Sequence, residues 1–282
     1  MRTKIIAEIA SCHNGDKDLA KVIIDAAARK GADLVKFQDW RASNVPKGDP
    51  DKQRYERYEF KEEWYPELIA HCHSRGVEFL TTCFNADRAE FLASLGLKTI
   101  KLASISLTNR DLLMAAGANF EHVILSTAMH GIEEIQEAID LMESNAKHFT
   151  VMHCVANYPL PPEDANLLKI QKLSEILTGA QYADIGYSDH SLDLDVAKTA
   201  IAMGVSYLEK HFSLSRHLPQ SPHQMYKGGP MVTTHEVSIE PHELKILSEW
   251  RDKVAIMVGD GNLENNKVEK AIRSRYDQRY GI

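Results

Sequence analysis

The stretch 186–213, GYSDHSLDLDVAKTAIAMGVSYLEKHFS, contains one complete strand–helix–strand unit. Its first strand ends at SDH (188–190) and its second at EKH (209–211), with a short amphipathic helix between them. Because a helical crossover joins neighbouring parallel strands, His190 and His211 are predicted to emerge side by side at one edge of the sheet. Each histidine alone fits a strand end bonded to the backbone, but two imidazoles beside acids are half of a divalent-metal site. The pair together therefore favours a metal.

The same alternation of strand and helix extends through the rest of the chain. Apolar strands are predicted at 4–10, 34–38, 77–82, 99–103, 122–127, 149–154, 182–187 and 205–210. Eight such units in 282 residues suit an α/β barrel, which commonly occupies about 250 residues. We therefore predict a single-domain (β/α)8 TIM barrel over residues 1–260, followed by a basic, helix-like C-terminal tail over 261–282. A doubly wound sheet is the alternative.

Composition narrows the class of protein. A hydrophobic content of 44% permits a large core, and a net charge of −7 without a basic block argues against nucleic acid and anionic membranes as partners. The chain begins with a strand rather than a signal peptide, and no apolar run approaches the roughly 20 residues of a membrane span, so we expect a cytoplasmic protein. Its four cysteines lack CxxC spacing and are expected to be free thiols: Cys12, Cys72, Cys83 and Cys154.

Two segments are longer than ordinary barrel loops. One covers 39–61 and is rich in Arg, Glu and Tyr, and the other covers the Pro/Gly-rich stretch 214–239 before a final helix at 241–258. Long loops in compact domains are often functional. Both segments are therefore candidates for contacts with a ligand.

Polar side chains end nearly every predicted strand, on the rim that carries the active site in barrel enzymes. Lys36 and Lys101 are the most informative of these, because they lie among apolar neighbours and a buried ammonium needs an anion. A salt bridge within the protein is one source of that anion. A phosphate or carboxylate ligand is the other, and it is favoured by hydroxyls on the same rim, those of Thr82, Ser104, Ser126 and Ser188.

Nine stretches together resemble the sialic acid (N-acetylneuraminate) synthase family, barrel enzymes that condense phosphoenolpyruvate with an open-chain sugar. They are IIAEIASCHNGD (5–16), ADLVKFQ (32–38), VEFLTTCF (77–84), IKLASISLTN (100–109), LSTAM (125–129), YPLPPEDANL (158–167), GYSDHS (186–191), YLEKHF (207–212) and HEVSIEPHELK (235–245). They occur in order over almost the whole chain, which makes the resemblance specific. It implies a barrel transferase of carbohydrate biosynthesis.

The resemblance also assigns roles to the rim residues. A divalent metal, manganese or else magnesium or cobalt, would be held by His190 and His211. The catalytic group would consist of Glu8, Glu209 and His211, with the two acids organising metal-bound water. The phosphate and carboxylate of phosphoenolpyruvate would be held by Lys36, Thr82, Lys101, Ser104, Ser126 and Ser188. The sugar would face Asn14, Gln38 and Tyr158.

The implied reaction forms a 2-keto-3-deoxy sugar acid. The metal activates the sugar aldehyde as a Lewis acid, C3 of phosphoenolpyruvate attacks the aldehyde carbon, water adds at C2, and phosphate leaves. Glu8 or Glu209 would take the proton from that water. The alternatives are a metal-dependent barrel aldolase or hydrolase, and a non-catalytic descendant that binds a sugar or a partner. The subunit number stays open, with a homodimer as one candidate.

Departures from the family pattern concentrate on the sugar. SIS (104–106) stands where Ser-Gly-Glu is usual, and Thr234 stands where an acid is usual. The loop 220–230 is longer than in the family, and relatives continue into a small antifreeze-like domain where this sequence ends at Ile282. Ser106 and Thr234 each replace an acid, so two charge-assisted contacts to the sugar are lost. We therefore expect an acceptor that is smaller than N-acetylmannosamine or substituted differently.

Overall fold

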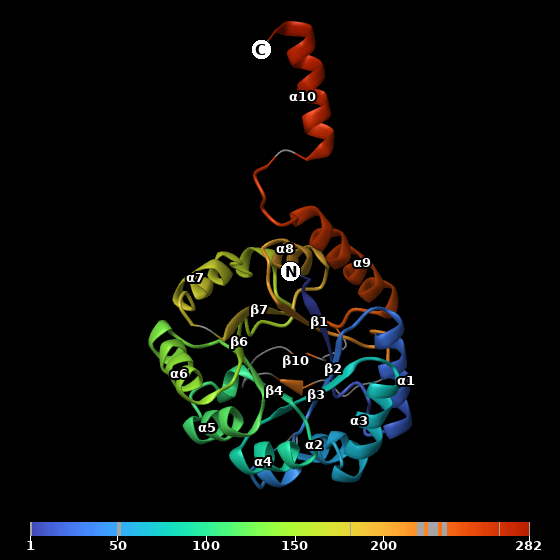
Figure 1. Cartoon of the computed structure of the whole chain (residues 1–282). Helices are drawn as coiled ribbons and strands as arrows, with labels where there is room; N and C mark the ends of the chain where they lie inside the picture. Colours follow the sequence, from blue (N-terminus) through green and yellow to red (C-terminus); the bar gives the residue numbers. More distant parts are fainter. Residues whose placement is uncertain are drawn as a thin grey trace.

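The computed structural model describes residues 2–49, 52–180, 182–218, 223–224, 231–232, 236–264 and 266–281. Eight parallel strands lie in chain order and close into a barrel (Figure 1), so the predicted (β/α)8 fold is confirmed and the doubly wound sheet is excluded. The strands are β1 (Lys4–Ala10), β2 (Leu34–Gln38), β3 (Glu78–Cys83), β4 (Thr99–Leu102), β5 (His122–Ser126), β6 (Phe149–Cys154), β7 (Ala183–Asp189) and β8 (Tyr207–His211).

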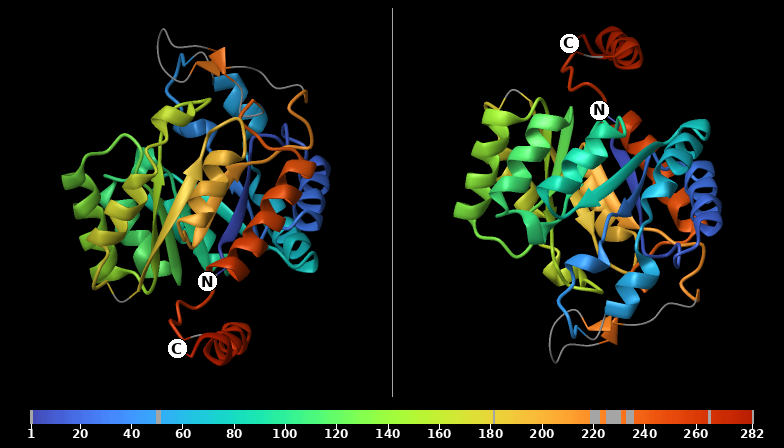
Figure 2. Two further views of the ribbon diagram at one scale, coloured as in Figure 1. Left: turned by 90° about the horizontal axis from the view of Figure 1, so that it is seen from above. Right: turned by 90° about the horizontal axis from the view of Figure 1, so that it is seen from below.

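One helix follows each strand and packs on the outside of the barrel (Figure 2). In chain order these helices are α1 (Lys17–Arg29), α3 (Tyr65–Ser74), α4 (Ala86–Ser94), α5 (Arg110–Asn119), α6 (Ile132–Asn145), α7 (Leu168–Ile176), α8 (Asp195–Ala202) and α9 (Pro241–Val258). Short 3-10 turns precede several of them, namely η1 (Ala42–Asn44), η2 (Glu62–Trp64), η3 (Ser104–Ser106) and η4 (Pro162–Asp164).

Side chains alternate along each strand between the barrel interior and the side that faces the helices. One level of the barrel interior is filled by an apolar layer of Ile6, Leu34, Leu80, Ile124, Met152 and Tyr207. Gly186 leaves room for two of these residues, because a Cβ there would lie 2.9 Å from Cγ of Met152 and 3.1 Å from the carbonyl oxygen of Tyr207. Close-packed side chains thus fill the barrel at this level.

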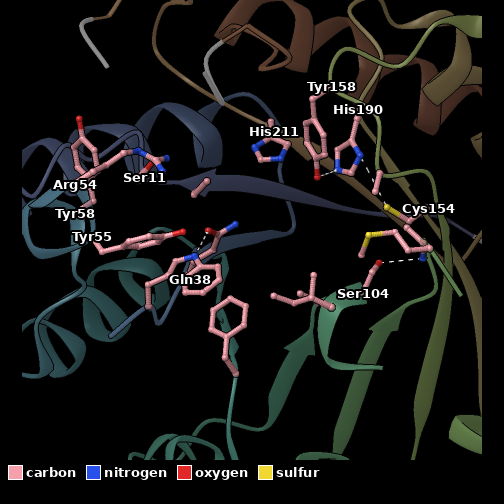
Figure 3. A pocket seen from close by; sticks show the side chains of 18 residues that line it. Ser11, Gln38, Arg54, Tyr55, Tyr58, Ser104, Cys154, Tyr158, His190 and His211 are labelled. Carbon is pink, nitrogen blue, oxygen red and sulfur yellow. Dashed lines mark hydrogen bonds between the residues drawn. The ribbon is translucent and has the colours of Figure 1, made fainter. Parts of the chain in front are cut away.

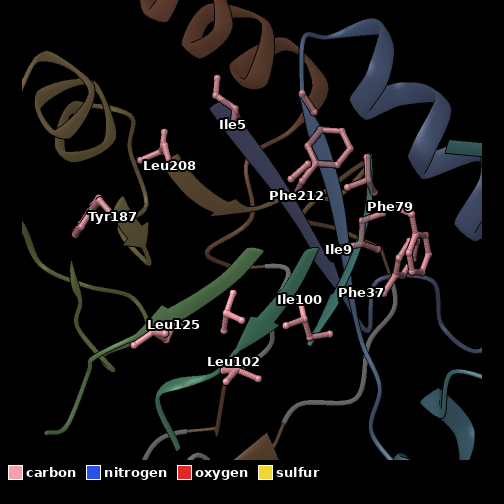
Figure 4. Close-up of a cluster of buried hydrophobic side chains, with 14 of the residues drawn as sticks. Ile5, Ile9, Phe37, Phe79, Ile100, Leu102, Leu125, Tyr187, Leu208 and Phe212 are labelled. Atoms are coloured by element: carbon pink, nitrogen blue, oxygen red, sulfur yellow. The ribbon is translucent and has the colours of Figure 1, made fainter. Parts of the chain in front are cut away.

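A larger apolar core lies between the barrel and its helices. Figure 4 shows part of it, including Ile5, Ile9, Phe37, Phe79, Ile100, Leu102, Leu125, Tyr187, Leu208 and Phe212. Burying a large apolar side chain contributes about 1.5–3 kcal/mol. Because this outer layer and the inner apolar layer hold the barrel together, the remaining interior positions are free to be polar.

The two strands beside the histidines end where the motifs SDH and EKH predict. β7 continues to Asp189, past the bound of 187 in the list of strands, and β8 covers Tyr207–His211, later at both ends than 205–210. Pairing between the strands is the reason, since Ser188 lies opposite Glu209 and Asp189 lies opposite Lys210. The acids beside the histidines are therefore parts of the sheet and not of the loops that follow.

The two long segments contain more structure than loops. Helix α2 (Lys52–Tyr58) forms inside 39–61, and the segment is anchored by the buried rings of Tyr58 and Phe60. Within 214–239, β9 (His223–Gln224) and β10 (Met231–Val232) pair antiparallel. Thr234 and most of 220–230, where the sequence departs from the family, lie outside the described residues.

The predicted helical tail is present as α10 (Lys267–Tyr280), which stands away from the barrel (Figure 1). None of the α10 side chains is buried. The division of the chain at residue 260 stays a prediction. All four cysteines are free and buried, as expected from their spacing. No helix in the described part of the chain is both long and apolar enough to cross a membrane.

Candidate active site

A layer of polar side chains lies above the apolar interior layer, two residues farther along the strands. Glu8 follows Ile6 in this way, and Lys36 follows Leu34, because alternate residues of a strand point into the barrel. The members of the layer are all buried, and they are Glu8, Lys36, Thr82, Lys101, Ser126, Cys154, Ser188 and Glu209. Except for Cys154, each of them was predicted as a site residue from the sequence.

Lys36 lies at the centre of a buried ion cluster. Its Nζ lies 2.7 Å from Oε2 of Glu8 and 3.3 Å from Oε2 of Glu209. The ammonium also donates to the hydroxyl of Thr82 at 3.1 Å, and Ser188 donates to Glu209 at 3.1 Å. The sequence left open whether a protein carboxylate or an anionic ligand pairs with each lysine. At Lys36 the protein itself supplies the anion.

The two carboxylates of this cluster differ in their pKa. Burial raises the pKa of Glu8 to about 7, although Lys36 acts in the opposite direction. Burial also acts to raise the pKa of Glu209, but the positive charges of Lys36 and Lys101 outweigh it and lower that pKa to about 2. Glu209 is therefore an anion at neutral pH, whereas Glu8 can both hold and release a proton there.

Lys101 has a different environment from Lys36. Its Nζ donates to the hydroxyl of Ser126 at 2.6 Å and to the carbonyl oxygen of Leu102 at 3.1 Å. No carboxylate in the described part of the chain lies within ion-pair distance of this ammonium, which is 2% exposed. Burial lowers its pKa, and the more distant Glu209 opposes that shift. Lys101 is a buried cation that still lacks a direct anionic partner.

The two histidines face each other at the ends of β7 and β8, as the sequence predicts. Their ring centroids lie 5.6 Å apart. Nδ1 of His190 donates to the carbonyl oxygen of Val155 at 2.7 Å, so its Nε2 is the acceptor of the hydroxyl of Tyr158 at 2.8 Å. Burial lowers the pKa of His190 to about 4 and that of His211 well below its usual value. Both rings are therefore neutral near pH 7, the form in which imidazole binds metals.

These two rings fit a metal that has few protein ligands. Nδ1 of His211 is buried and has no hydrogen-bond partner among the residues that the structure describes. Within the same residues, no group of three or more His, Cys, Asp or Glu side chains is arranged to hold a metal ion. A metal here would be held by His190 and His211 and would take its remaining ligands from water and substrate oxygens.

A cavity of about 340 Å³ opens above the polar layer (Figure 3). One side carries His190, His211 and Tyr158, whose ring stacks on His190 with centroids 3.9 Å apart. The opposite side carries Arg54 and Tyr55 from α2. The cavity is thus bounded by the strand ends and by the helix formed from the first long segment.

The site residues predicted from the sequence either line the cavity or lie beneath it, with one exception. Those that line the cavity are Gln38, Ser104, Tyr158, His190 and His211. The others lie beneath it in the polar layer, except Asn14, which is in the turn after β1 and does not line the cavity. Ser106, at the position of the family's acid, is also buried away from the lining, whereas Ile105 lines it.

Gln38 joins the lining to the polar layer. Its amide nitrogen donates to Oε1 of Glu8 at 2.8 Å, and its amide oxygen accepts from the indole of Trp40 at 2.8 Å. Trp40 in turn stacks on Phe84 with ring centroids 3.8 Å apart. This chain of contacts fixes the orientation of Gln38.

Several lining residues escaped the sequence analysis. Trp40, Arg54, Tyr55 and Tyr58 all come from the segment 39–61, and Phe84 follows β3. The length of the segment made it a candidate for contacts with a ligand, and its aromatic and arginine content was the only signal for individual residues. Nothing in the sequence showed which of its side chains would face the cavity, because that depends on the placement of α2.

Comparison with known proteins agrees with this arrangement. The model of the NeuB family matches residues 23–263. The N,N'-diacetyllegionaminic acid synthase of Campylobacter jejuni is 33% identical over 95% of this chain and 81% of its own, and the pseudaminic acid synthase of Helicobacter pylori is 34% identical over 78% and 68%. The sialic acid synthetase of Leptospira borgpetersenii, solved with citrate, superposes with a TM-score of 0.87 at 29% identity, covering 100% of this chain and 93% of that one.

The match covers the barrel and its rim rather than one motif. The resemblance inferred from nine short stretches is confirmed, since relatives above 30% identity include legionaminic and pseudaminic acid synthases. Because the family model matches most of the barrel, this chain belongs to the NeuB family of sugar acid synthases.

Proposed function

We propose that this chain is a metal-dependent synthase that condenses phosphoenolpyruvate with an open-chain aldose and releases phosphate. The observation that carries the proposal is Lys101, a buried cation without a carboxylate partner among the described residues, beneath a cavity bordered by two neutral histidines. An anionic substrate at the floor of the cavity would pair with Lys101, and its aldehyde co-substrate would lie near the two histidines. The relatives' activity as sugar acid synthases supports the same reaction.

Phosphoenolpyruvate would occupy the floor of the cavity. Lys101 and Ser126, already hydrogen-bonded to each other, would hold its anionic groups, and Ser104 would reach it from the lining. Lys36 is already paired with two acids, so it would form no new ion pair with the substrate. Its positive charge would attract the substrate's anionic groups from a longer distance. Charge-assisted hydrogen bonds of this kind are about twice as strong as neutral ones.

His190 and His211 would hold the divalent metal, for which manganese is our proposal. When bound there, the metal would supply a Lewis acid for the aldehyde oxygen. The protein's own contribution is to keep both imidazoles neutral by burial and to fix His190 through its Nδ1 hydrogen bond to Val155, while Tyr158 would have to release Nε2 to a metal. Such fixing of a ligand by its second nitrogen is typical of metal-binding histidines.

Glu8 is the residue best suited to move the proton. Carbon–carbon bond formation leaves positive charge at C2 of phosphoenolpyruvate, and water adds there before phosphate departs. The water must lose a proton, and a base with a pKa near neutrality is the most effective acceptor. The pKa of Glu8 is raised to about 7 by burial, whereas that of Glu209 is lowered to about 2. We therefore assign the base to Glu8 and a fixed negative charge to Glu209.

A reconstitution assay tests the proposal. The protein is incubated with phosphoenolpyruvate, manganese and a panel of aldoses while released phosphate and product mass are followed. We expect phosphate release only when all three are present, and a product with the mass of the aldose plus one pyruvic acid. Phosphate released without an aldose would indicate a hydrolase, and cleavage without phosphoenolpyruvate an aldolase. Sugar binding without turnover would indicate a non-catalytic descendant.

A further inference from the structure

Arg54 is a cation on the cavity wall that faces the histidines. Figure 3 shows it beside Tyr58, on the side of the cavity opposite His190. Its guanidinium carbon lies 5.8 Å from the ring centroid of Tyr58 and 5.8 Å from that of Tyr55. Its Nε is buried and has no hydrogen-bond partner among the described residues. Within that part of the chain, no carboxylate lies within 4.0 Å of the guanidinium either.

Two nearby arginines show the contrast. Arg41 contacts Asp39 at 3.3 Å and Glu62 at 3.0 Å, and Arg88 contacts the same two acids. A guanidinium is always charged and carries five donors, so a partly buried one is normally paired with an acid. Arg54 is half-buried and lines the cavity, without such a partner among the described residues.

The charge of the lining points the same way. No acidic side chain lines the cavity in the described residues. Arg54 is the one arginine of the described lining, which contains no lysine. A substrate with a negative group at that end would gain an ion pair, whereas a neutral one would leave a half-buried cation unpaired.

We infer that the acceptor sugar carries an anionic group, a phosphate or a carboxylate, at the end away from its aldehyde, and that Arg54 binds this group. The inference rests on the proposed function, which puts the aldehyde beside His190 and His211. A planar guanidinium can donate two parallel hydrogen bonds to either group. Binding at Arg54 would therefore select the acceptor and also direct its aldehyde toward the histidines.

The test compares matched acceptors in matched variants. Mannose, mannose 6-phosphate and mannuronate differ mainly in the charge at C6, and they are assayed with phosphoenolpyruvate and manganese. Arg54→Met removes the charge and Arg54→Lys keeps it. Arg57→Met is the control, because Arg57 lies on the same helix, is exposed and does not line the cavity. The two anionic acceptors distinguish recognition of phosphate from recognition of carboxylate.

We expect kcat/KM to be higher for an anionic acceptor than for mannose by roughly 10- to 100-fold in the unmodified protein. Arg54→Met should abolish this preference, Arg54→Lys should restore part of it, and Arg57→Met should preserve it. The KM for phosphoenolpyruvate should stay the same in all four proteins. An equal rate with mannose would overturn the inference, and so would a raised KM for phosphoenolpyruvate in Arg54→Met, which would assign Arg54 to that substrate.

A binding measurement separates this inference from the proposed function. Mannose 6-phosphate and mannuronate are titrated by calorimetry into the unmodified protein and into Arg54→Met, without phosphoenolpyruvate. Binding of either that is lost in Arg54→Met supports the anion site, even if no aldose is turned over and the proposed reaction fails. Failure of both to bind, or equal binding to the two proteins, refutes the anion site, even if phosphoenolpyruvate is consumed with another acceptor.

Discussion

The same substitution at two buried lysines should have different effects on stability. Lys36→Met removes the one cation that lies between Glu8 and Glu209, at 2.7 and 3.3 Å. Two carboxylates would then share a buried site, and breaking a buried ion pair in this way costs about 3–5 kcal/mol. One of the acids can take up a proton, so this loss should be smaller at pH 5 than at pH 8.

Lys101→Met should behave differently because no carboxylate among the described residues contacts Lys101 directly. The change loses two hydrogen bonds, to Ser126 and to the carbonyl of Leu102, at about 1 kcal/mol each. It also removes a buried ammonium, whose burial costs several kcal/mol. The free energy of unfolding should therefore stay the same or rise by up to about 2 kcal/mol, since Met is of similar length and apolar.

Urea denaturation without metal or substrate measures both effects. Lys98→Met serves as the control, since Lys98 is exposed and paired with Glu121 on the surface, and it should change the free energy by less than about 0.5 kcal/mol. Calorimetry with phosphoenolpyruvate should show a loss of roughly 2–5 kcal/mol in binding for Lys101→Met. If Lys101→Met destabilises the protein as much as Lys36→Met does, the protein itself satisfies Lys101, and the argument for phosphoenolpyruvate fails.

Three further predictions concern the metal, acid stability and the tail. His190→Ala and His211→Ala should each abolish tight manganese binding in calorimetry; retention of metal by both variants would contradict the two-histidine site. Burial lowers the pKa of His122 to about 3, so the unfolded chain binds more protons and stability should fall as the pH drops from about 6.5 toward 3. His122→Gln should reduce that slope by about 1.4 kcal/mol per pH unit in denaturation at several pH values, and an unchanged slope would refute the assignment. Truncation after Gly259 should leave the urea midpoint unchanged, because no α10 side chain is buried, and a lowered midpoint would show that the tail supports the barrel.

The sequence was sufficient for the fold and for most of the buried polar layer. Glu8, Lys36 and Lys101 are charged residues within apolar strands, and such residues must either pair or bind a ligand. What the sequence did not show is which of these outcomes applies to each lysine. That depends on the closure of the barrel, which brings Glu209 of β8 across to Lys36 of β2 but leaves Lys101 of β4 without a contacting acid.

The cavity wall was less predictable than its floor, and the reason is geometric. Strand residues point inward at every second position, so the floor follows from counting, as the step from Ile6 to Glu8 shows. Asn14 belongs to a turn, for which no such period exists, and its assignment to the sugar finds no support in the cavity lining. Arg54 belongs to a short helix whose placement depends on buried contacts of Tyr58 and Phe60.

This division between floor and wall has a consequence for how the acceptor is chosen. The floor residues are held by barrel pairing and by one another, so changing them alters stability and the shared chemistry together. The wall at α2 is anchored by the buried rings of Tyr58 and Phe60, and Arg54 on it forms no ion pair with the described residues. We therefore expect that Arg54 can be replaced at little cost to stability. The placement of Arg54 there, and not in the strands, fits a residue that selects the sugar while the barrel interior retains the reaction.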